Sequence, residues 1–238
     1  MLIKKILGIC GLSLLLTAQA HAGVVMVKTR LIYPANSPSE TLHLSNEDDF
    51  PYVVQVWTDN GDDKSTPKTA DGPYLVSPPI FKMEPRSGQS VRLVYTGNNA
   101  PTDRESVAYV NFAQIPPSTE GENEMSVVVK HRLKVFYRPQ KLPVNVERLS
   151  EHVVFEKHNK QVTLSNQSPY FLSLSAMKAV DAKGKEVILQ HEMVAPYSST
   201  VLMTRNGQKN LAIEPQKMVY NYVTDLGGIV SKQFSFTK

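Results

Sequence analysis

The feature that most constrains this chain is a succession of short β-strand patterns separated by turn signals, without a long stretch of helical periodicity. The segments 52–57, 91–95 and 107–112 are rich in β-branched and aromatic residues. Turn sequences such as Asn60-Gly61 and Asp71-Gly72-Pro73 separate them. Short strands with turns at this spacing are typical of β-sandwiches, so we expect an all-β fold.

A second run of strand patterns follows a proline-containing segment and predicts a second sandwich. Pro139 and Pro143 lie close together, and such prolines interrupt a strand ladder and stiffen the chain. Further strands are expected at 153–155, 161–164, 170–175, 185–189, 200–203, 217–224 and 229–236. The chain of 238 residues is long enough for two domains of about 100 residues each, which we place at 23–140 and 141–238.

The first 22 residues have the organisation of a secretory signal peptide. Lys4 and Lys5 form a positive start, residues 6–16 are apolar, and Ala20-His21-Ala22 is a cleavage site of the small-x-small type. A transmembrane anchor is the alternative, but the apolar stretch is short for a span and no stop-transfer pattern follows it. We expect a mature protein that begins at Gly23 and is exported to the periplasm.

Cysteine usage and charge exclude several classes of protein. The single cysteine, Cys10, lies inside the apolar run, so the mature chain would depend on its core and not on disulfides. Ile9 stands where a lipoprotein signal needs a small residue. The net charge of +4 is small, scattered and partly contributed by the signal segment, which argues against nucleic acid as a partner.

The sequence contains no recognisable catalytic, metal-binding or nucleotide-binding pattern. Its histidines after residue 22 lack paired ligand spacing, and it has no serine nucleophile elbow and no glycine-rich phosphate loop. The acidic run 47–49 lies between strands and reads as a solvated turn. We therefore expect a protein that is not an enzyme and that uses no metal, cofactor or nucleotide.

Several segments, in order along the chain, resemble the periplasmic assembly chaperones of chaperone–usher pili. They are Thr29-Arg30-Leu31-Ile32-Tyr33-Pro34, the region 78–93, the region 103–117, Lys134-Val135-Phe136-Tyr137-Arg138-Pro139 and Asn221-Tyr222-Val223-Thr224-Asp225-Leu226-Gly227-Gly228. The short polar segment 118–124 resembles the members with a short loop at this place. The resemblance implies two immunoglobulin-like β-sandwich domains in an L or boomerang arrangement. It also implies a chaperone that stabilises pilus or fimbrial subunits by lending them a β-strand and delivers them to an outer-membrane usher.

The resemblance assigns Arg30 and Lys134 to the C-terminal carboxylate of a bound subunit. Two cations in a partly dry cleft can hold such an anion through charge-assisted hydrogen bonds. Without the resemblance, both residues would be interpreted as solvated strand charges. It further assigns Glu105, Arg138 and Asp225 to ion pairs between the domains.

The segment 125–137 is the longest strand candidate and would contain the donated strand. Met125, Val127 and Val129 match the alternating apolar residues that enter the groove of an incomplete subunit; on the pattern alone they would be an ordinary core strand. An exposed apolar strip invites aggregation, so we expect the free protein to cover it, for example by self-association.

Two other kinds of protein fit parts of the pattern. A structural pilus subunit should carry its own donor extension, whereas here a strand pattern begins directly after residue 22. A carbohydrate-binding β-sandwich needs exposed aromatic platforms, whereas the single tryptophan, Trp57, lies in an apolar strand and is expected in the core.

Overall fold

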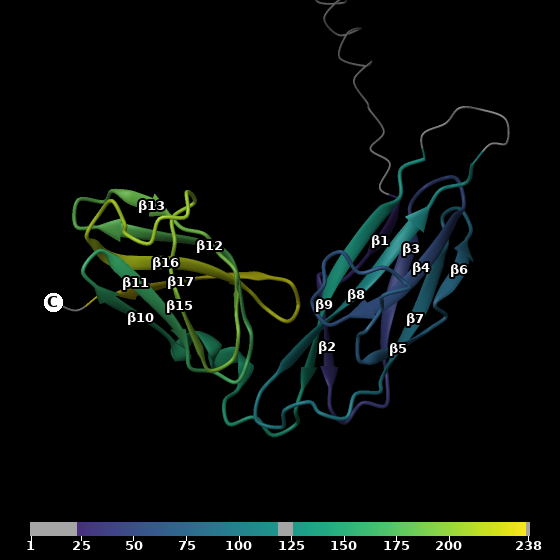
Figure 1. Cartoon of the computed structure of the whole chain (residues 1–238), viewed down its shortest axis with the longest axis horizontal. Helices are drawn as coiled ribbons and strands as arrows, with labels where there is room; N and C mark the ends of the chain where they lie inside the picture. The colour runs from purple at the N-terminus through teal and green to yellow at the C-terminus, as the bar shows by residue number, and fades with distance from the viewer. Residues whose placement is uncertain (1–22, 119–125, 237–238) are drawn as a thin grey trace, which may run out of the picture.

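The protein is almost entirely β-structure, as seen in a computed structural model that describes residues 23–118 and 126–236 (Figure 1). The strands form two sandwiches, which confirms the all-β, two-sandwich prediction. The predicted signal peptide at 1–22 and Met125 lie outside the described residues. Within the described ranges, no helix has the length and apolar character required to cross a membrane.

The first sandwich consists of two sheets. Its strands are β1 (Val24–Met26), β2 (Arg30–Pro34), β3 (Glu40–Asn46), β4 (Tyr52–Asp59), β5 (Tyr74–Ser77), β6 (Ile80–Met83), β7 (Gly88–Tyr95), β8 (Ser106–Ile115) and β9 (Val129–Arg138). One sheet has the order β1-β3-β7-β5, and the other has the order β2-β9-β8-β4-β6. β2 runs parallel to β9, whereas the other neighbours in this sheet are antiparallel.

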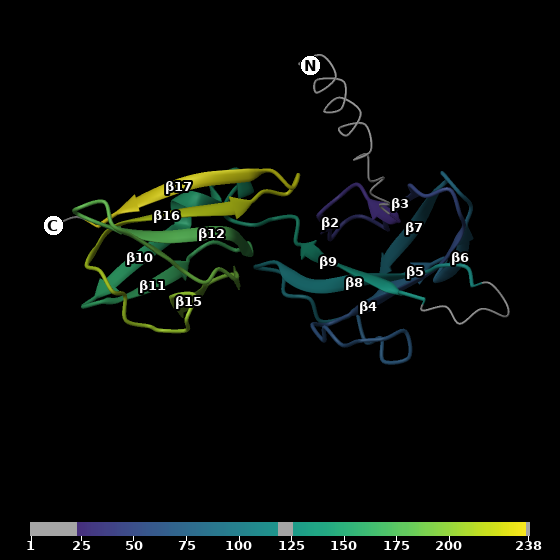
Figure 2. The ribbon, with the colours of Figure 1, turned by 90° about the horizontal axis from the view of Figure 1, so that it is seen from above.

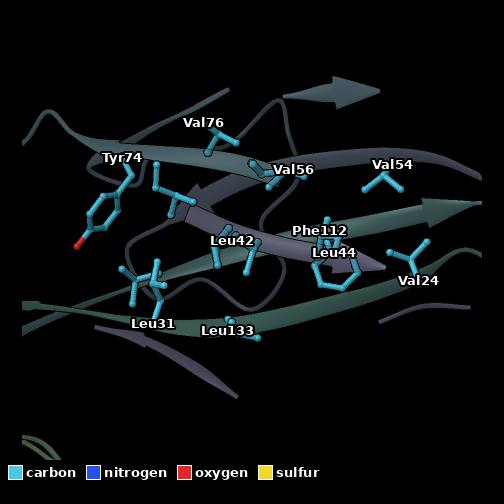
Figure 3. Close-up of a cluster of buried hydrophobic side chains, with 14 of the residues drawn as sticks. Val24, Leu31, Leu42, Leu44, Val54, Val56, Tyr74, Val76, Phe112 and Leu133 are labelled. Carbon is cyan, nitrogen blue, oxygen red and sulfur yellow. The ribbon is translucent and has the colours of Figure 1, made fainter. Parts of the chain in front are cut away.

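Alternating apolar residues of both sheets fill the space between them. Leu42 and Leu44 on β3 point toward Val54 and Phe112 of the opposite sheet, and all four are almost completely buried (Figure 3). Full burial of an aliphatic or aromatic side chain of this size contributes about 1.5–3 kcal/mol. The alternating strand pattern predicted from the sequence therefore corresponds to side chains of the two sheets packed against each other.

The second sandwich follows a short 3₁₀-helix. Its elements are η1 (Val146–His152), β10 (Val153–His158), β11 (Gln161–Asn166), β12 (Leu172–Asp181), β13 (Glu186–Ile188), β14 (Met193–Val194), β15 (Ser198–Val201), β16 (Pro215–Val223) and β17 (Ile229–Ser235). One sheet has the order β10-β11-β15; the other has the order β13-β12-β16-β17, with β14 paired to β12. A separate cluster of buried apolar residues, which includes Leu164, Leu172 and Met218, forms its core.

A buried asparagine closes the same kind of turn in each sandwich. Asn46 Nδ2 donates to the backbone oxygens of Phe50 and Glu84, at 2.9 and 3.0 Å. Asn166 Nδ2 donates to the backbone oxygen of Tyr170 at 2.7 Å, four residues downstream as for Asn46 and Phe50. Each amide satisfies backbone acceptors that would otherwise be buried without a partner.

The two sandwiches are joined end to end at an angle. The chain leaves the first domain at the end of β9 and enters η1, and the turn between β16 and β17 reaches back toward β2 and β9 (Figures 1 and 2). The predicted boundary at Gln140 falls in this connection, and its position there stays a prediction. The ends of β2, β9 and β16 therefore meet where the domains meet.

Candidate functional site

Arg30 and Lys134 lie opposite each other on neighbouring strands. The parallel pairing of β2 with β9 brings them into register, and the same ladder continues to Pro34 and Arg138. Arg30 is buried; its Nη1 donates to the backbone oxygen of Val223 in the second domain at 3.1 Å. Its Nε is also buried but has no hydrogen-bond partner among the described residues.

The surroundings of Arg30 and Lys134 disfavour the charged forms of both side chains. Burial lowers the pKa of Arg30, although Asp225 and Glu105 act in the opposite direction. Burial also lowers the pKa of Lys134, and the charge of Arg30 lowers it further. Between described residues, neither cation takes part in an ion pair within 4.0 Å. A pair of close, partly buried cations with an unused donor is chemically suited to hold an anion.

A three-residue ion-pair network lies beside this pair and connects the two domains. Arg138 Nε lies 2.7 Å from Glu105 Oε1, and its Nη1 and Nη2 lie 2.6 and 2.9 Å from the carboxylate oxygens of Asp225. Glu105 also accepts from the backbone nitrogen of Phe171 at 2.8 Å. Since Glu105 and Arg138 belong to the first domain and Asp225 to the second, the network spans the junction.

Burial governs the acid–base behaviour of the network. It raises the pKa of Glu105, although Arg138 and the Phe171 amide oppose the shift. For Arg138, burial alone would lower the pKa, but Asp225 and Glu105 together raise it well above its ordinary value. Arg138 therefore stays charged, and the orientation of the domains depends on its two carboxylate partners.

A cavity of about 530 Å³ extends from Arg30 into the junction. Its lining combines the guanidinium groups of Arg30 and Arg138 with apolar side chains, among them Phe136, Tyr222 and Leu226. Leu226 is 99 % exposed at the tip of the β16–β17 turn. Arg30 therefore lines a cleft between the domains, and Lys134 is its neighbour on the adjacent strand.

Among the described residues, the upstream half of β9 has a neighbouring strand on one edge only. β8 pairs with β9 from Val129 to Tyr137, whereas β2 covers β9 only from Lys134 onward. The edge that begins beside Lys134 is therefore free to accept another strand.

Of the apolar residues predicted for donation, Val129 is the first residue of β9 and Val127 lies just before it. Val127 and Val129 are 64 % and 38 % exposed. β9 begins at Val129, four residues later than the strand candidate of the sequence, so the predicted alternation is not tested at Val127. Among the described members of the strip, neither valine is part of the core, which contradicts the interpretation as an ordinary core strand.

Sequence reasoning missed a second polar cluster on the outer face of the same sheet. Asp59 has no exposed surface and lies 2.6 Å from Arg132 of β9. Trp57 was expected in the core; it is buried, but it lies outside the inter-sheet cluster and donates to Ser65 at 3.0 Å. The sequence Trp57-Thr58-Asp59-Asn60-Gly61 reads as a strand running into a turn, and it contains no signal that the carboxylate would be buried.

The fold and the site define a class of protein: two immunoglobulin-like sandwiches that present a free strand edge beside a cationic interdomain cleft. Family profiles identify the particular kind. The profile described as "Pili and flagellar-assembly chaperone, PapD N-terminal domain" matches residues 23–143, and "Pili assembly chaperone PapD, C-terminal domain" matches residues 148–234. The chain belongs to the family of pilus-assembly chaperones, and the resemblance seen in the sequence is confirmed.

Individual relatives and solved structures agree with this assignment. The chaperone protein HifB of Haemophilus influenzae is 36 % identical over 200 residues, covering 80 % of this chain and 81 % of that protein. FimB/FhaD of Bordetella pertussis is 30 % identical over 243 residues, covering 97 % and 96 %. The crystal structure of the CupB2 chaperone of Pseudomonas aeruginosa matches with a TM-score of 0.76 at 25 % identity, covering 90 % of this chain and all of that one.

Proposed function

We propose that this protein acts in the periplasm as a chaperone that binds pilus or fimbrial subunits and passes them to an outer-membrane usher. The observation that carries the proposal is the free edge of β9, which begins beside the Arg30–Lys134 pair. A partner strand can add to such an edge through backbone hydrogen bonds, and its terminal carboxylate can reach the two cations. Membership of the chaperone family supports the same role.

Apolar side chains of the donated segment supply the free energy of binding. Val127 and Val129 are exposed in the free protein, and each is worth about 1.5–3 kcal/mol when fully buried in a partner. Met125 is proposed as the third such residue from its place in the sequence. Because strand pairing and partner folding drive the process, the proposed activity is binding and not catalysis, and it needs no nucleotide or other cofactor.

Glu105, Arg138 and Asp225 have a supporting role in this proposal. Their ion pairs hold the second domain in a fixed orientation, so that the β16–β17 turn stays at the cleft beside Arg30. The backbone oxygen of Val223 then occupies one donor of Arg30, and the other guanidinium donors are proposed to bind the incoming carboxylate.

Replacing Lys134 by alanine tests the proposal. Loss of one cation from the clamp should weaken subunit binding by about 2–5 kcal/mol. The free protein should remain folded, since removing Lys134 relieves its repulsion with Arg30. Lys134→Ala and the matched strand variant Lys232→Ala on β17 should be compared by co-purification with subunits and by thermal melts.

A peptide with the sequence of a subunit's C-terminal strand sharpens this test. The free-acid peptide should bind the wild type, and the C-terminal amide should bind far more weakly, because the amide lacks the anion. Arg30→Ala should act like Lys134→Ala, with losses that do not add when the two are combined. Equal binding of acid and amide would contradict the carboxylate clamp.

The two other kinds of protein, a sugar-binding sandwich and a structural pilus subunit, would give different results in the co-purification experiment. A sugar-binding sandwich would bind oligosaccharides, yet Trp57 is only 6 % exposed and offers no platform. A finished pilus subunit would assemble with other subunits instead of releasing them. Co-purification of soluble one-to-one complexes with subunits distinguishes the proposed chaperone from both.

A further inference from the structure

A completely buried carboxylate fastens the donor strand to the outer face of the first sandwich. Asp59, the last residue of β4, accepts four hydrogen bonds. Its Oδ1 accepts from Arg132 Nη2 at 2.6 Å and from the backbone nitrogen of Gly61 at 2.7 Å. Its Oδ2 accepts from Asn111 Nδ2 at 2.6 Å and from Ser65 Oγ at 3.0 Å. One side chain therefore connects β4, β8, β9 and the 60–72 loop.

A second residue of β9 attaches to the same loop. Lys130 Nζ donates to the backbone oxygens of Asp63 and Ser65, at 2.5 and 3.3 Å, and lies 5.9 Å from the centre of the Trp57 ring. Arg132 stacks on the ring of Tyr109, with its guanidinium carbon 3.7 Å from the ring centre. We refer to Asp59, Ser65, Asn111, Lys130 and Arg132 as the Asp59 network.

The network acts on the part of β9 that its neighbours hold least. β2 supports β9 only from Lys134 onward, and the polar contacts of Lys130 and Arg132 fall just before that point. A strand with one hydrogen-bonded edge is prone to fraying and to slipping in register. Side chains of a strand alternate between faces, so fastening the even-numbered residues to the outer face turns Val129 toward the opposite face.

We propose that the Asp59 network positions the free half of β9 for strand addition, and that Lys130 and Arg132 are positioning residues for subunit capture. This inference rests on the proposed chaperone function. A buried ion pair is an expensive way to stabilise a sheet face, because apolar side chains of similar volume often do as well or better. The best-attested use of such a pair is to fix register, which is what a donated strand requires.

Lys130→Met tests the positioning role without leaving a buried charge unpaired. The methionine can still cover Trp57, but it cannot donate to the loop. Hydrogen exchange of the backbone amides at 129–133 that bond to β8 should become about tenfold faster, the effect of losing one charged hydrogen bond. Subunit capture should fall several-fold while the melting temperature changes little.

Three companion variants complete the experiment. Lys130→Arg keeps a donor and should restore both exchange and capture. Lys82→Met on β6, at the other edge of the same sheet, should alter neither. The double variant Asp59→Asn/Arg132→Gln removes both charges of the ion pair. As in Lys130→Met, hydrogen exchange of the backbone amides at 129–133 should become faster, whereas exchange in the rest of the domain should not.

The readouts separate this inference from the proposed function. Unchanged exchange at 129–133 in both Lys130→Met and the double variant would overturn the inference, as would faster exchange with normal capture. Faster exchange throughout the domain would mean that the network only stabilises the fold. Failure of the wild type to capture any subunit would instead overturn the proposed function, whatever the exchange data show.

Discussion

Asp59 shows how a single side chain can be decisive and yet be invisible in the sequence. The motif Asp59-Asn60-Gly61 is a normal way to end a strand, and most aspartates in such a place face water. Here the chain after β4 folds back over the sheet, and donors from three other segments converge on the carboxylate. Only tertiary structure can bring these donors together, so local sequence patterns could not predict them.

Asp59→Asn should change how stability depends on pH. Burial alone would raise the pKa of Asp59, but hydrogen bonds led by that from Arg132 lower it below its ordinary value of 3.8. A carboxyl group with a lower pKa in the folded than in the unfolded protein adds stability above its ordinary pKa. That stability is lost as the pH falls through the lowered value.

Urea unfolding of wild type and Asp59→Asn at several values from about pH 2 to about pH 6 measures this effect. The free energy of unfolding of the wild type should fall more steeply toward acid pH than that of the variant. Parallel profiles would show that Asp59 titrates alike in the folded and unfolded states, in disagreement with its four donors.

The strand β9 is the element on which sequence and structure can best be compared. The sequence predicts a strand over 125–137, and the structure has β9 from Val129 to Arg138, so the end of the strand was predicted within one residue. Its start was not, because a run of valines has strand propensity whether or not a neighbour is available to pair with. Trp57 follows the same rule: the sequence indicates burial but not which face of the sheet provides it.

The repeated asparagine turn was also missed from the sequence. Ser-Asn occurs at 45–46 and again at 165–166, each time with an aromatic residue four positions after the asparagine, but two short matches far apart carry little weight alone. By contrast, the family resemblance assigned the site residues Arg30, Lys134, Glu105, Arg138 and Asp225. Nothing in their local pattern distinguishes them from solvated strand charges.

Val127→Asp should separate binding from folding at the start of the donor segment. Val127 is exposed, and surface substitutions of this kind usually change stability by less than about 0.5 kcal/mol. In a complex the new carboxylate would be buried without a partner, which is strongly unfavourable. The melting temperature should therefore stay nearly constant while subunit capture is abolished.

Ile188→Asp is the matched control, since Ile188 is an exposed apolar strand residue of the second domain. It should affect neither melting nor capture. A large fall in the melting temperature of Val127→Asp, seen by circular dichroism, would show that the residue is packed in the first domain. The strand-donation mechanism would then lose its basis.

In the whole molecule, specific ion-pair and aromatic contacts hold the junction between the domains. Arg138 provides the principal ion pairs, Phe136 lies 5.6 Å from Phe171, and Arg104 lies 5.0 Å from the ring of Tyr197 across the junction. Such a junction can be fixed in angle while contributing modestly to the stability of either sandwich.

Arg138→Gln should loosen the angle between the domains. The change removes the only ion-pair partner that Glu105 has within 4.0 Å among the described residues, and Glu105 is buried. Breaking a buried pair by removing one partner costs about 3–5 kcal/mol, and partial exposure of Arg138 and Asp225 places this case at or below that range. Small-angle X-ray scattering should show a broader distribution of interdomain distances.

The exposed pair between Arg148 and Glu151 provides the control for Arg138→Gln. Arg148→Gln should leave both the scattering profile and the unfolding transition unchanged, because both side chains of that pair are exposed. Identical scattering of wild type and Arg138→Gln would show that other contacts set the angle.

Gly227→Ala should disturb the contact between the β16–β17 turn and the first domain. Gly227 has a φ of +83°, and a Cβ there would lie 2.8 Å from Thr29 Oγ1. The left-handed backbone alone costs about 1–2 kcal/mol for alanine. Gly207 has a similar φ of +77°, but a Cβ added there would have open space around it. Gly207→Ala therefore measures the backbone cost alone.

The difference between the two glycine variants in the free energy of unfolding, measured with urea, gives the cost of the close approach between a Cβ at position 227 and Thr29. Gly227→Ala should be the more destabilised of the two, and it should also weaken subunit binding because the turn borders the cleft at Leu226. Equal destabilisation with unchanged binding would show that the turn moves away from Thr29 without consequence.

The register between β2 and β9 has one further consequence. Arg30 is the first residue of β2 and the partner of Lys134, so the cation pair stands where the pairing of β2 with β9 begins. Val129 and Val127 precede Lys134 by five and seven residues, and these intervals are fixed by the covalent chain. For a partner whose terminus binds the two cations, the clamp would fix the register of the partner strand, and side chains on one face of that strand recur every two residues. If one more residue separated the partner's apolar residues from its terminus, the wrong face of the partner strand would lie against the valines. The proposed clamp would then select partners by whether that interval is odd or even, as well as by their side chains.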